Sequence, residues 1–332
     1  MVITTPYSPS ATGGRRPPAQ GARRVREWAR VESVTVTAAA AGTWTLGDLE
    51  VNRLGFGALR LTGNGMGGNS DGAPIDREVA VRILRQAVEL GVNHIDTASF
   101  YFSPLRSANE LINRALAPYS DDLLIATKVG PWRHPSGEWL GMAGPGQLRG
   151  QVEENLRQLG RDHLDVVNLR VNGIVSVADH FGALADLRKA GLIRHLGLSC
   201  VTPAQLAEAL TIAPVVCVQN PYGLDQRRAD ESGLIDDCHR QGIAFVPFFA
   251  ISGRRREAPA DGTHDHALRG IARAHGATPA QILLAWTLHR GPHVLAIPGT
   301  SDPDHLAQNV AAGALRLSPE DLEALDTVKA PS

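Results

Sequence analysis

Lys128 stands out in this chain by its residue type and by its position. The sequence contains 30 arginines but only three lysines, and Lys128 ends the apolar run 123–128. A lysine ammonium is a compact point charge that, unlike the larger guanidinium, can lose its hydration beside a neighbour and tune the pKa of that neighbour. Asp96 and Tyr101 lie at the end of another such run, which begins at residue 93. We therefore look for acid–base chemistry where these two runs end.

Short apolar runs alternate with helical patterns after residue 43, and these elements must position the candidate residues. The runs predict strands at 54–59, 94–98, 123–129, 164–171, 195–200, 215–220, 244–251 and 294–298. Helical patterns include 79–90, 147–159, 180–190, 203–212, 231–241, 279–289 and 303–311. Thr202, Thr278 and Asp302 each precede a proline, as N-cap residues do before a proline at the first helical position.

Eight strands with crossover helices predict a (β/α)8 TIM barrel of the α/β class. The turn at Gly47 and Asp48 predicts an N-terminal β-hairpin capping the barrel bottom. An open doubly wound sheet is the competing architecture, but Arg60 stands where the third glycine of the dinucleotide fingerprint belongs. Barrel enzymes carry their catalytic groups at the carboxyl ends of the strands. Here these positions hold Asp96, Tyr101, Lys128, Arg170, Ser199, Gln219 and Phe248.

A set of motifs, in this order along the chain, resembles the aldo-keto reductase family. They are Asp96-Thr97-Ala98 followed by Tyr101, Ala126-Thr127-Lys128, Gly197-Leu198-Ser199, Val218-Gln219-Asn220, and Ile297-Pro298-Gly299-Thr300-Ser301 with Asn309. The resemblance covers residues 43–329, and the runs 165–170 and 246–249 resemble the bacterial pyridoxal reductase branch. It implies an NADPH-dependent reduction of an aldehyde or ketone to an alcohol.

The resemblance implies that Tyr101 gives the proton to the carbonyl oxygen. An ordinary tyrosine has a pKa near ~10, and a neighbouring ammonium lowers it. Lys128 would supply that charge, and Asp96 would hold Lys128 in place and charged. The alternative is that Asp96 and Lys128 form a purely structural buried ion pair beside a loop aromatic.

Arg170 departs from the family pattern, which has histidine at this strand end. An arginine stays protonated and cannot act as a general acid. We expect Arg170 to orient the carbonyl, to stabilise the developing alkoxide and to help lower the pKa of Tyr101. It could instead pair with an acidic or phenolate group of the substrate, or serve as a salt-bridge partner at the barrel rim.

The resemblance also implies a cofactor site. Ser199, Cys200 and Gln219 would hold the nicotinamide amide, with Cys200 in a slot that usually carries asparagine, and Phe248 would stack on the ring. The adenosine phosphate would meet Thr300, Ser301, His305, Gln308 and Asn309, near a helix N-terminus with free amides.

The choice between the two nicotinamide cofactors rests on a few positions. Gly299 and His305 occupy slots that usually carry lysine and arginine, which makes NADH the alternative to NADPH. The basic run 254–256 could restore positive charge over the cofactor, or form a solvated turn.

The substrate side is predicted from the loop 131–145, which contains Trp132, His134 and Trp139. Trp132 matches a loop aromatic that lines the pocket in the family. The group suits a flat aromatic aldehyde such as a pyridine aldehyde, although polyketide or sugar carbonyls would also fit. The glycine-rich loop 63–72 should shape access. His264 and His266 are interpreted as a solvated loop, and no metal site is predicted.

Composition excludes several classes of protein. A net charge of −1 gives no overall attraction to nucleic acid or to a membrane surface. No apolar run approaches the ~20 residues of a membrane span, and no signal peptide is visible. Three separated cysteines fit a reducing cytosol, so we expect a cytoplasmic protein, a monomer or weak oligomer, whose partner is a small carbonyl compound.

Residues 1–42, rich in Pro, Gly, Ala and Arg, are predicted to be a disordered tail without a specific role. A nucleic-acid or targeting role for this tail is the alternative.

Two other functions compete with reduction: a cofactor-binding regulatory barrel with little turnover, and a lyase that uses Lys128 in a Schiff base. The acidic and phenolic neighbours of Lys128 argue against the lyase, because they favour a charged amine.

Overall fold

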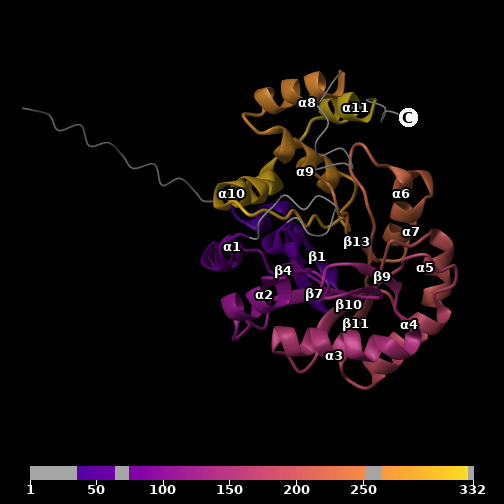
Figure 1. Ribbon diagram of the computed structural model, residues 1–332. Helices are drawn as coiled ribbons and strands as arrows, with labels where there is room; N and C mark the ends of the chain where they lie inside the picture. The colour runs from indigo at the N-terminus through magenta and orange to yellow at the C-terminus, as the bar shows by residue number, and fades with distance from the viewer. Residues whose placement is uncertain (1–35, 64–74, 252–262, 328–332) are drawn as a thin grey trace, which may run out of the picture. The chain divides into compact units, whose positions relative to one another are not determined.

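The computed structural model describes residues 36–63, 75–251 and 263–327 (Figure 1). The predicted tail lies outside this part as far as residue 35. The 3-10 turn η1 (Ala38–Ala41) lies inside it, and Ala38 and Ala41 are buried in the hydrophobic core. Residues 36–42, predicted to be part of the tail, therefore belong to the folded part.

The predicted barrel is confirmed. Seven parallel strands form one sheet in the order β13-β12-β11-β10-β7-β4-β3. Their bounds are β3 Phe56–Gly57, β4 His94–Asp96, β7 Leu124–Val129, β10 Leu164–Arg170, β11 Ile193–Ser199, β12 Cys217–Gln219 and β13 Ala244–Phe245. The eighth predicted strand closes the sheet, because the Leu295 amide donates to Phe245 O at 2.9 Å and the Ala296 amide to Arg53 O at 2.8 Å.

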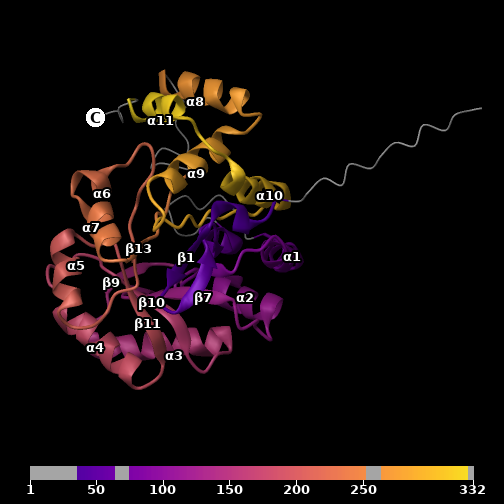
Figure 2. The ribbon, with the colours of Figure 1, turned by 180° about the vertical axis from the view of Figure 1, so that it is seen from behind.

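Helices surround these strands, as the views from the front and from behind show (Figures 1 and 2). They are α1 Arg77–Glu89, α2 Ala108–Leu116, α3 Leu148–Leu159, α4 Ala178–Lys189, α5 Pro203–Leu210, α6 Arg228–Glu231, α7 Leu234–Arg240, α8 Thr263–Ala274, α9 Pro279–His289, α10 Pro303–Ala311 and α11 Pro319–Asp326. The three predicted N-caps are confirmed: the side chains of Thr202, Thr278 and Asp302 each accept a hydrogen bond from an amide of the first turn.

Some predicted elements differ from the structure. The single helix predicted at 231–241 is interrupted by Gly233, whose φ of 73° separates α6 from α7. The strand predicted at 244–251 ends at Phe245. His264 and His266, expected in a loop, lie in α8. Helices α2, α8 and α11 are not among the helices predicted from the sequence.

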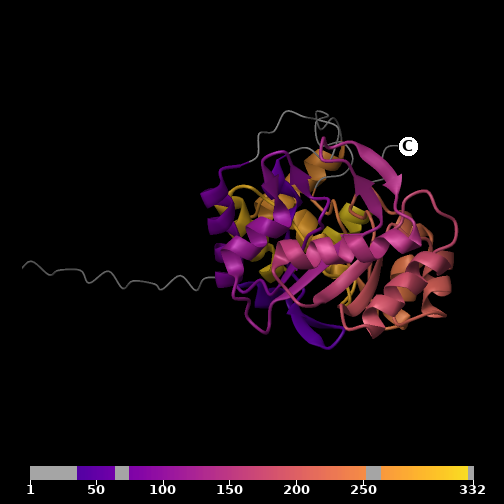
Figure 3. The same ribbon diagram turned by 60° about the horizontal axis from the view of Figure 1, so that its bottom comes forward.

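Two β-hairpins mark opposite ends of the barrel (Figure 3). The predicted hairpin of β1 (Thr43–Leu46) and β2 (Leu49–Asn52) closes the end where the strands begin, and Asp48 at its tip contacts Arg194 and His195, each at 2.6 Å. The hairpin of β8 (Pro131–Arg133) and β9 (Trp139–Met142) follows the carboxyl end of β7, where the sequence predicts a loop.

Candidate active site

The register of the barrel strands explains why the predicted residues converge. Strand side chains alternate between two faces, so residues two apart share one face. Arg170 is paired with Ser199, and Ser199 with Gln219, across neighbouring strands. Lys128 is paired with Asn168, two residues before Arg170, and Asp96 is paired with Ala126, two residues before Lys128. Because the strands are parallel, their carboxyl ends meet, and the polar residues of these adjoining levels together form a polar layer at that end of the barrel.

Lys128 and Asp96 form a buried ion pair in this layer. The Lys128 Nζ lies 2.6 Å and 2.7 Å from the two carboxylate oxygens of Asp96, and it also donates to Thr97 O at 3.0 Å. The side chains are 1% and 7% exposed. Burial alone would lower the pKa of Lys128, but Asp96 and then Tyr101 outweigh burial and raise it. Lys128 is therefore a permanent charge and a poor nucleophile, which argues against a Schiff-base lyase.

Tyr101 lies directly beside this pair. Tyr101 is 6% exposed, and the Lys128 Nζ is 4.8 Å from the centre of the Tyr101 ring. Burial raises the pKa of Tyr101 and so does the negative charge of Asp96, while the positive charges of Lys128 and Arg170 act to lower the pKa without reversing the rise. The sequence predicts the effect of the two cations but not the larger effect of burial. The net result is a phenol that keeps its proton until a reaction draws the proton away.

Arg170, at the carboxyl end of β10, faces the same site. Its guanidinium carbon lies 5.2 Å from the centre of the Phe248 ring. Among the described residues no carboxylate pairs with this guanidinium, so the alternative of a rim salt bridge is not found there. Within this part of the chain, the guanidinium donors of Arg170 are therefore available to a bound molecule.

Ser199 and Gln219 provide the best evidence for a ligand at this layer. The Gln219 Nε2 donates to Asp96 Oδ1 at 2.7 Å, a contact that the sequence does not predict. In the described part of the chain, Ser199 Oγ and Gln219 Oε1 are buried without a hydrogen-bond partner. Buried polar groups are normally satisfied. A carboxamide has one donor group and one acceptor, so these two residues fit the nicotinamide amide.

Cys200 follows Ser199 in an unusual backbone conformation. Its φ is 60°, in the left-handed region that asparagine tolerates better than most residues. The next strand holds it there, because the Cys200 amide donates to Gln219 O at 3.0 Å and Asn220 bonds both backbone groups of Val201. The conformation accounts for the asparagine expected in this slot, and this chain adopts it with a cysteine.

The start of α10, predicted to meet the adenosine phosphate of the cofactor, differs from the prediction. Free amides were expected at the start of α10. Instead, the Asp302 carboxylate accepts from the amides of Asp304 and His305 at 2.8 Å and 3.2 Å. The N-cap predicted at Asp302 is thus correct, but the same cap removes the free amides that an anion would need.

The other residues predicted at this end divide by burial. Thr300 and Asn309 are buried, whereas Ser301, His305 and Gln308 are exposed. The absence of a lysine at Gly299 has a steric reason, because a Cβ there would collide with the Gly57 carbonyl oxygen. The basic run 254–256 lies outside the described residues.

The β8–β9 hairpin carries the predicted substrate aromatics. Trp132 and Trp139 are 41% and 42% exposed, and Trp139 lies edge-on to Phe100, with ring centres 5.8 Å apart. His134 is exposed and contacts Ser136. Most of the predicted access loop 63–72 lies outside the described residues.

Two buried asparagines support the site, and the sequence did not reveal them. Asn109 on α2 accepts from Thr97 Oγ1 at 2.7 Å, and Asn155 on α3 accepts from Thr127 Oγ1 at 2.5 Å. Asn109 also donates to Asn155 at 2.9 Å. They fix the residues next to Asp96 and Lys128. A polar residue on the buried face of a predicted helix is the signal that could have identified them.

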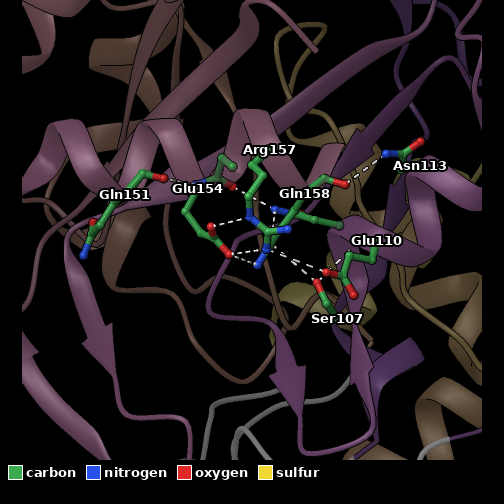
Figure 4. A network of polar contacts seen from close by, with 9 residues as sticks. Ser107, Glu110, Asn113, Gln151, Glu154, Arg157 and Gln158 are labelled. Atoms are coloured by element: carbon green, nitrogen blue, oxygen red, sulfur yellow. Dashed lines mark hydrogen bonds and ion pairs between the residues drawn. The ribbon is translucent and has the colours of Figure 1, made fainter. Parts of the chain in front are cut away.

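The network continues to the outer surface of α2 and α3 (Figure 4). Asn109 Nδ2 donates to Gln158 Oε1 at 3.0 Å, and Gln158 Nε2 donates to Glu154 at 2.7 Å. Arg157 pairs with Glu154 at 2.7 Å and lies 3.8 Å from Glu110. This polar chain joins the two helices behind the strand ends that carry the ion pair.

The barrel and its polar layer define a class of protein, and comparison with known sequences gives the same class. The model of the aldo/keto reductase family matches residues 53–330, and the chain belongs to this family of oxidoreductases. In the part of the chain that the structure describes, no helix is long and apolar enough to cross a membrane.

Individual relatives narrow the comparison. The chain is 46% identical over 296 residues to pyridoxine 4-dehydrogenase of Escherichia coli. The alignment covers 87% of this chain and 99% of the relative. Two crystal structures of a Klebsiella pneumoniae aldo-keto reductase, one with NADPH and one with NADP and acetate, are 28% and 29% identical. Both match with a TM-score of 0.71; they cover 87% of this chain and 95% and 96% of their own.

Proposed function

We propose that this protein is an NADP(H)-dependent carbonyl reductase in which Tyr101 is the proton donor. The observation that carries the proposal is the buried Lys128–Asp96 pair beside the phenol of Tyr101. The nicotinamide, when bound, supplies a hydride to the carbonyl carbon. Tyr101 gives its proton to the carbonyl oxygen, and water returns a proton to the phenolate afterwards. The carbonyl compound is thereby reduced to an alcohol.

Lys128 and Asp96 act through Tyr101 in this proposal. A phenolate forms as the proton leaves, and the adjacent ammonium stabilises that negative charge. Asp96 holds the ammonium by two contacts and is itself fixed by Gln219. Asp96 and Gln219 thus hold the ammonium of Lys128 in place before the reaction, so little reorganisation is needed when negative charge develops on Tyr101.

Arg170 is proposed to contact the substrate. Its permanent charge faces the site, and among the described residues it has no carboxylate partner. It can donate hydrogen bonds to the developing alkoxide and to an acidic substituent beside the carbonyl. We assign it an orienting and electrostatic role, with Tyr101 as the sole proton donor.

The proposed substrate is an aromatic aldehyde of the pyridoxal type, or its alcohol in the reverse direction. The name of the Escherichia coli relative, pyridoxine 4-dehydrogenase, supports this choice. The exposed Trp132 and Trp139 provide flat apolar surfaces on the hairpin beside the site.

The residues predicted to meet the adenosine phosphate give less support for NADPH than the nicotinamide site does. The Asp302 carboxylate already accepts from two amides of α10, and a lysine side chain at residue 299 would collide with the Gly57 carbonyl oxygen. NADPH is still proposed, because the cofactors named in the two Klebsiella pneumoniae structures are NADPH and NADP.

A turnover assay tests the function. Purified protein is incubated with NADPH or NADH and with pyridoxal, benzaldehyde or a sugar aldehyde, while cofactor oxidation and product are measured. We expect the highest kcat/KM with NADPH and pyridoxal. Tight NADPH binding without oxidation by any aldehyde would contradict the proposal and favour the regulatory barrel. Faster turnover with NADH would overturn the cofactor assignment alone.

A further inference from the structure

Arg133 holds the backbone on both sides of Tyr101. It ends β8 and is 8% exposed. Its Nη1 donates to Phe102 O at 2.7 Å and to Phe100 O at 3.3 Å. These carbonyls belong to the residues immediately before and after Tyr101. One guanidinium nitrogen thus spans the residue proposed to be the proton donor.

The guanidinium is itself oriented by the β8–β9 hairpin. Arg133 Nε donates to Gly137 O at 2.9 Å within the hairpin. Its Cζ lies 4.7 Å from the centre of the Phe102 ring and 5.5 Å from that of Trp139. Gly137 has a φ of 96°, and a side chain there would approach Arg133 Nη2 to 3.1 Å. Among the described residues, the planar group thus contacts the Phe102 and Trp139 rings and the carbonyls of Gly137, Phe100 and Phe102, a geometry that suits arginine better than lysine.

The segment around Tyr101 has little secondary structure of its own. Strand β5 comprises only Phe102 and Ser103. The Tyr101 backbone makes two hydrogen bonds, from its amide to Ala98 O at 3.0 Å and from the Ala108 amide to its carbonyl at 2.9 Å. A side chain that binds the two adjacent carbonyls adds the restraint that this short strand lacks.

We propose that Arg133 is a positioning residue that fixes Tyr101 beside Lys128 and couples it to the β8–β9 hairpin. The hairpin also carries Trp132 and Trp139, which are exposed toward solvent and are expected to meet the substrate. A substrate that presses on the hairpin is thus connected through Arg133 to the proton donor. The proposal rests on the role proposed above for Tyr101.

Three variants test this inference. Arg133→Met keeps the length of the side chain and removes its donors, whereas Arg133→Lys keeps the charge and some of the donors. Arg149→Met is the matched control, because Arg149 is exposed on α3 and contacts Glu153 at 3.5 Å, away from Tyr101. For each variant we would measure kcat, KM, the NADPH dissociation constant, the thermal midpoint and the pH dependence of kcat.

We expect Arg133→Met to lower kcat by about 10²-fold, because a small misplacement of a reacting group has an effect of that order. The NADPH dissociation constant should stay close to that of the wild type. The pH limb assigned to Tyr101 should shift, because a displaced phenol changes its burial and its distance from Lys128 and Asp96. Arg133→Lys should recover part of kcat and of the pH profile, and Arg149→Met should match the wild type.

Two results would overturn the inference. One is a kcat and pH profile for Arg133→Met equal to those of Arg149→Met. The other is a lower kcat with an unchanged pH limb and no recovery in Arg133→Lys, which indicates a structural effect only. If Arg133→Met does not fold, the pH limb of Arg133→Lys decides by the same criterion.

Tyr101→Phe, assayed in parallel, separates this inference from the proposed function. Full activity in Tyr101→Phe contradicts the proposed mechanism itself. If Tyr101→Phe is inactive, the mechanism stands, and the kcat and pH profile of the Arg133 variants alone decide whether Arg133 positions the phenol.

Discussion

Strand β4 carries two buried ionisable residues on one face, His94 and Asp96, and the barrel gives them opposite surroundings. His94, at the amino end, has no hydrogen-bond partner for either ring nitrogen among the described residues. Burial lowers its pKa to about 4, so it stays neutral. Asp96, two residues later, contacts Lys128 and Gln219. The ionisable residue at the amino end of β4 is neutral, whereas the one at the carboxyl end is a carboxylate with hydrogen-bond partners.

This contrast separates stability from chemistry. A (β/α)8 barrel carries its catalytic groups where the strands end and mainly stabilising contacts where they begin. At the amino end, His94 fills the space left by Gly55, where a side chain would collide with its ring. At the carboxyl end, the ion pair lies beside Tyr101 and the unpartnered oxygens of Ser199 and Gln219. Substitutions at Lys128, Arg170 and His94 test whether the two ends are separate in this way.

The largest effect is expected for Lys128→Met. This change leaves Asp96 buried beside an apolar side chain and removes the charge next to Tyr101. Breaking a buried pair costs about 3–5 kcal/mol of unfolding free energy, and loss of acid catalysis lowers kcat by about 10²–10⁴-fold. Urea unfolding and steady-state kinetics measure the two quantities. Lys189→Met is the control, because Lys189 is 78% exposed. Near wild-type values in both assays would show that the pair is not essential.

A smaller effect is expected for Arg170→His, at the same end of the barrel. Removing one donor to a developing oxyanion lowers kcat by about 10²-fold. If Arg170 also binds an acidic substituent, the loss should be greater for pyridoxal, which has a phenol beside its aldehyde, than for benzaldehyde. The ratio of kcat/KM for these two substrates measures that preference. Unchanged turnover and unchanged preference would show that neither assigned role is correct.

At the amino end we expect a change in stability with no change in turnover. Because the pKa of His94 is lowered from about 6.5 to about 4 on folding, the unfolded chain binds more protons between these values. The stabilising contribution is complete above about pH 6.5 and is lost as the pH falls toward 4, a total of about 3 kcal/mol. His94→Leu should flatten this dependence in urea unfolding between pH 7 and 4.5 while kcat is retained.

Two comparisons complete the His94 test. His293 has its pKa lowered to about 4 as well, so part of the pH dependence should remain in His94→Leu. His266→Leu, at an exposed position on α8, should leave the dependence as in the wild type. A large loss of kcat in His94→Leu would contradict the separation of the two ends.

Most of the barrel could be predicted from the sequence, because its signals are local. Alternating apolar runs, prolines after capping residues and glycines after helices each act within a few residues. The strand ends that carry Asp96, Lys128 and Arg170 follow from the same pattern. The hairpin β8–β9 was missed because Trp139 and Leu140 are exposed and do not form an alternating pattern.

The support around the site could not be predicted, because it depends on contacts between distant segments. Asn109 and Asn155 are 46 residues apart in the chain and meet only when α2 packs on α3. Arg133 reaches Phe100 O across 33 residues. The balance of effects on the pKa of Tyr101 likewise requires the burial of its ring, which the sequence does not state.

The most direct test of the central claim is a single-turnover measurement of Tyr101→Phe with NADPH bound and pyridoxal added. Tyr119→Phe is the matched control, because Tyr119 lies away from the site and donates to Leu159 O at 2.7 Å. We predict that Tyr101→Phe binds NADPH as the wild type does but reduces the aldehyde at least about 10²-fold more slowly. A rate equal to that of Tyr119→Phe would contradict the assignment of Tyr101 as the proton donor.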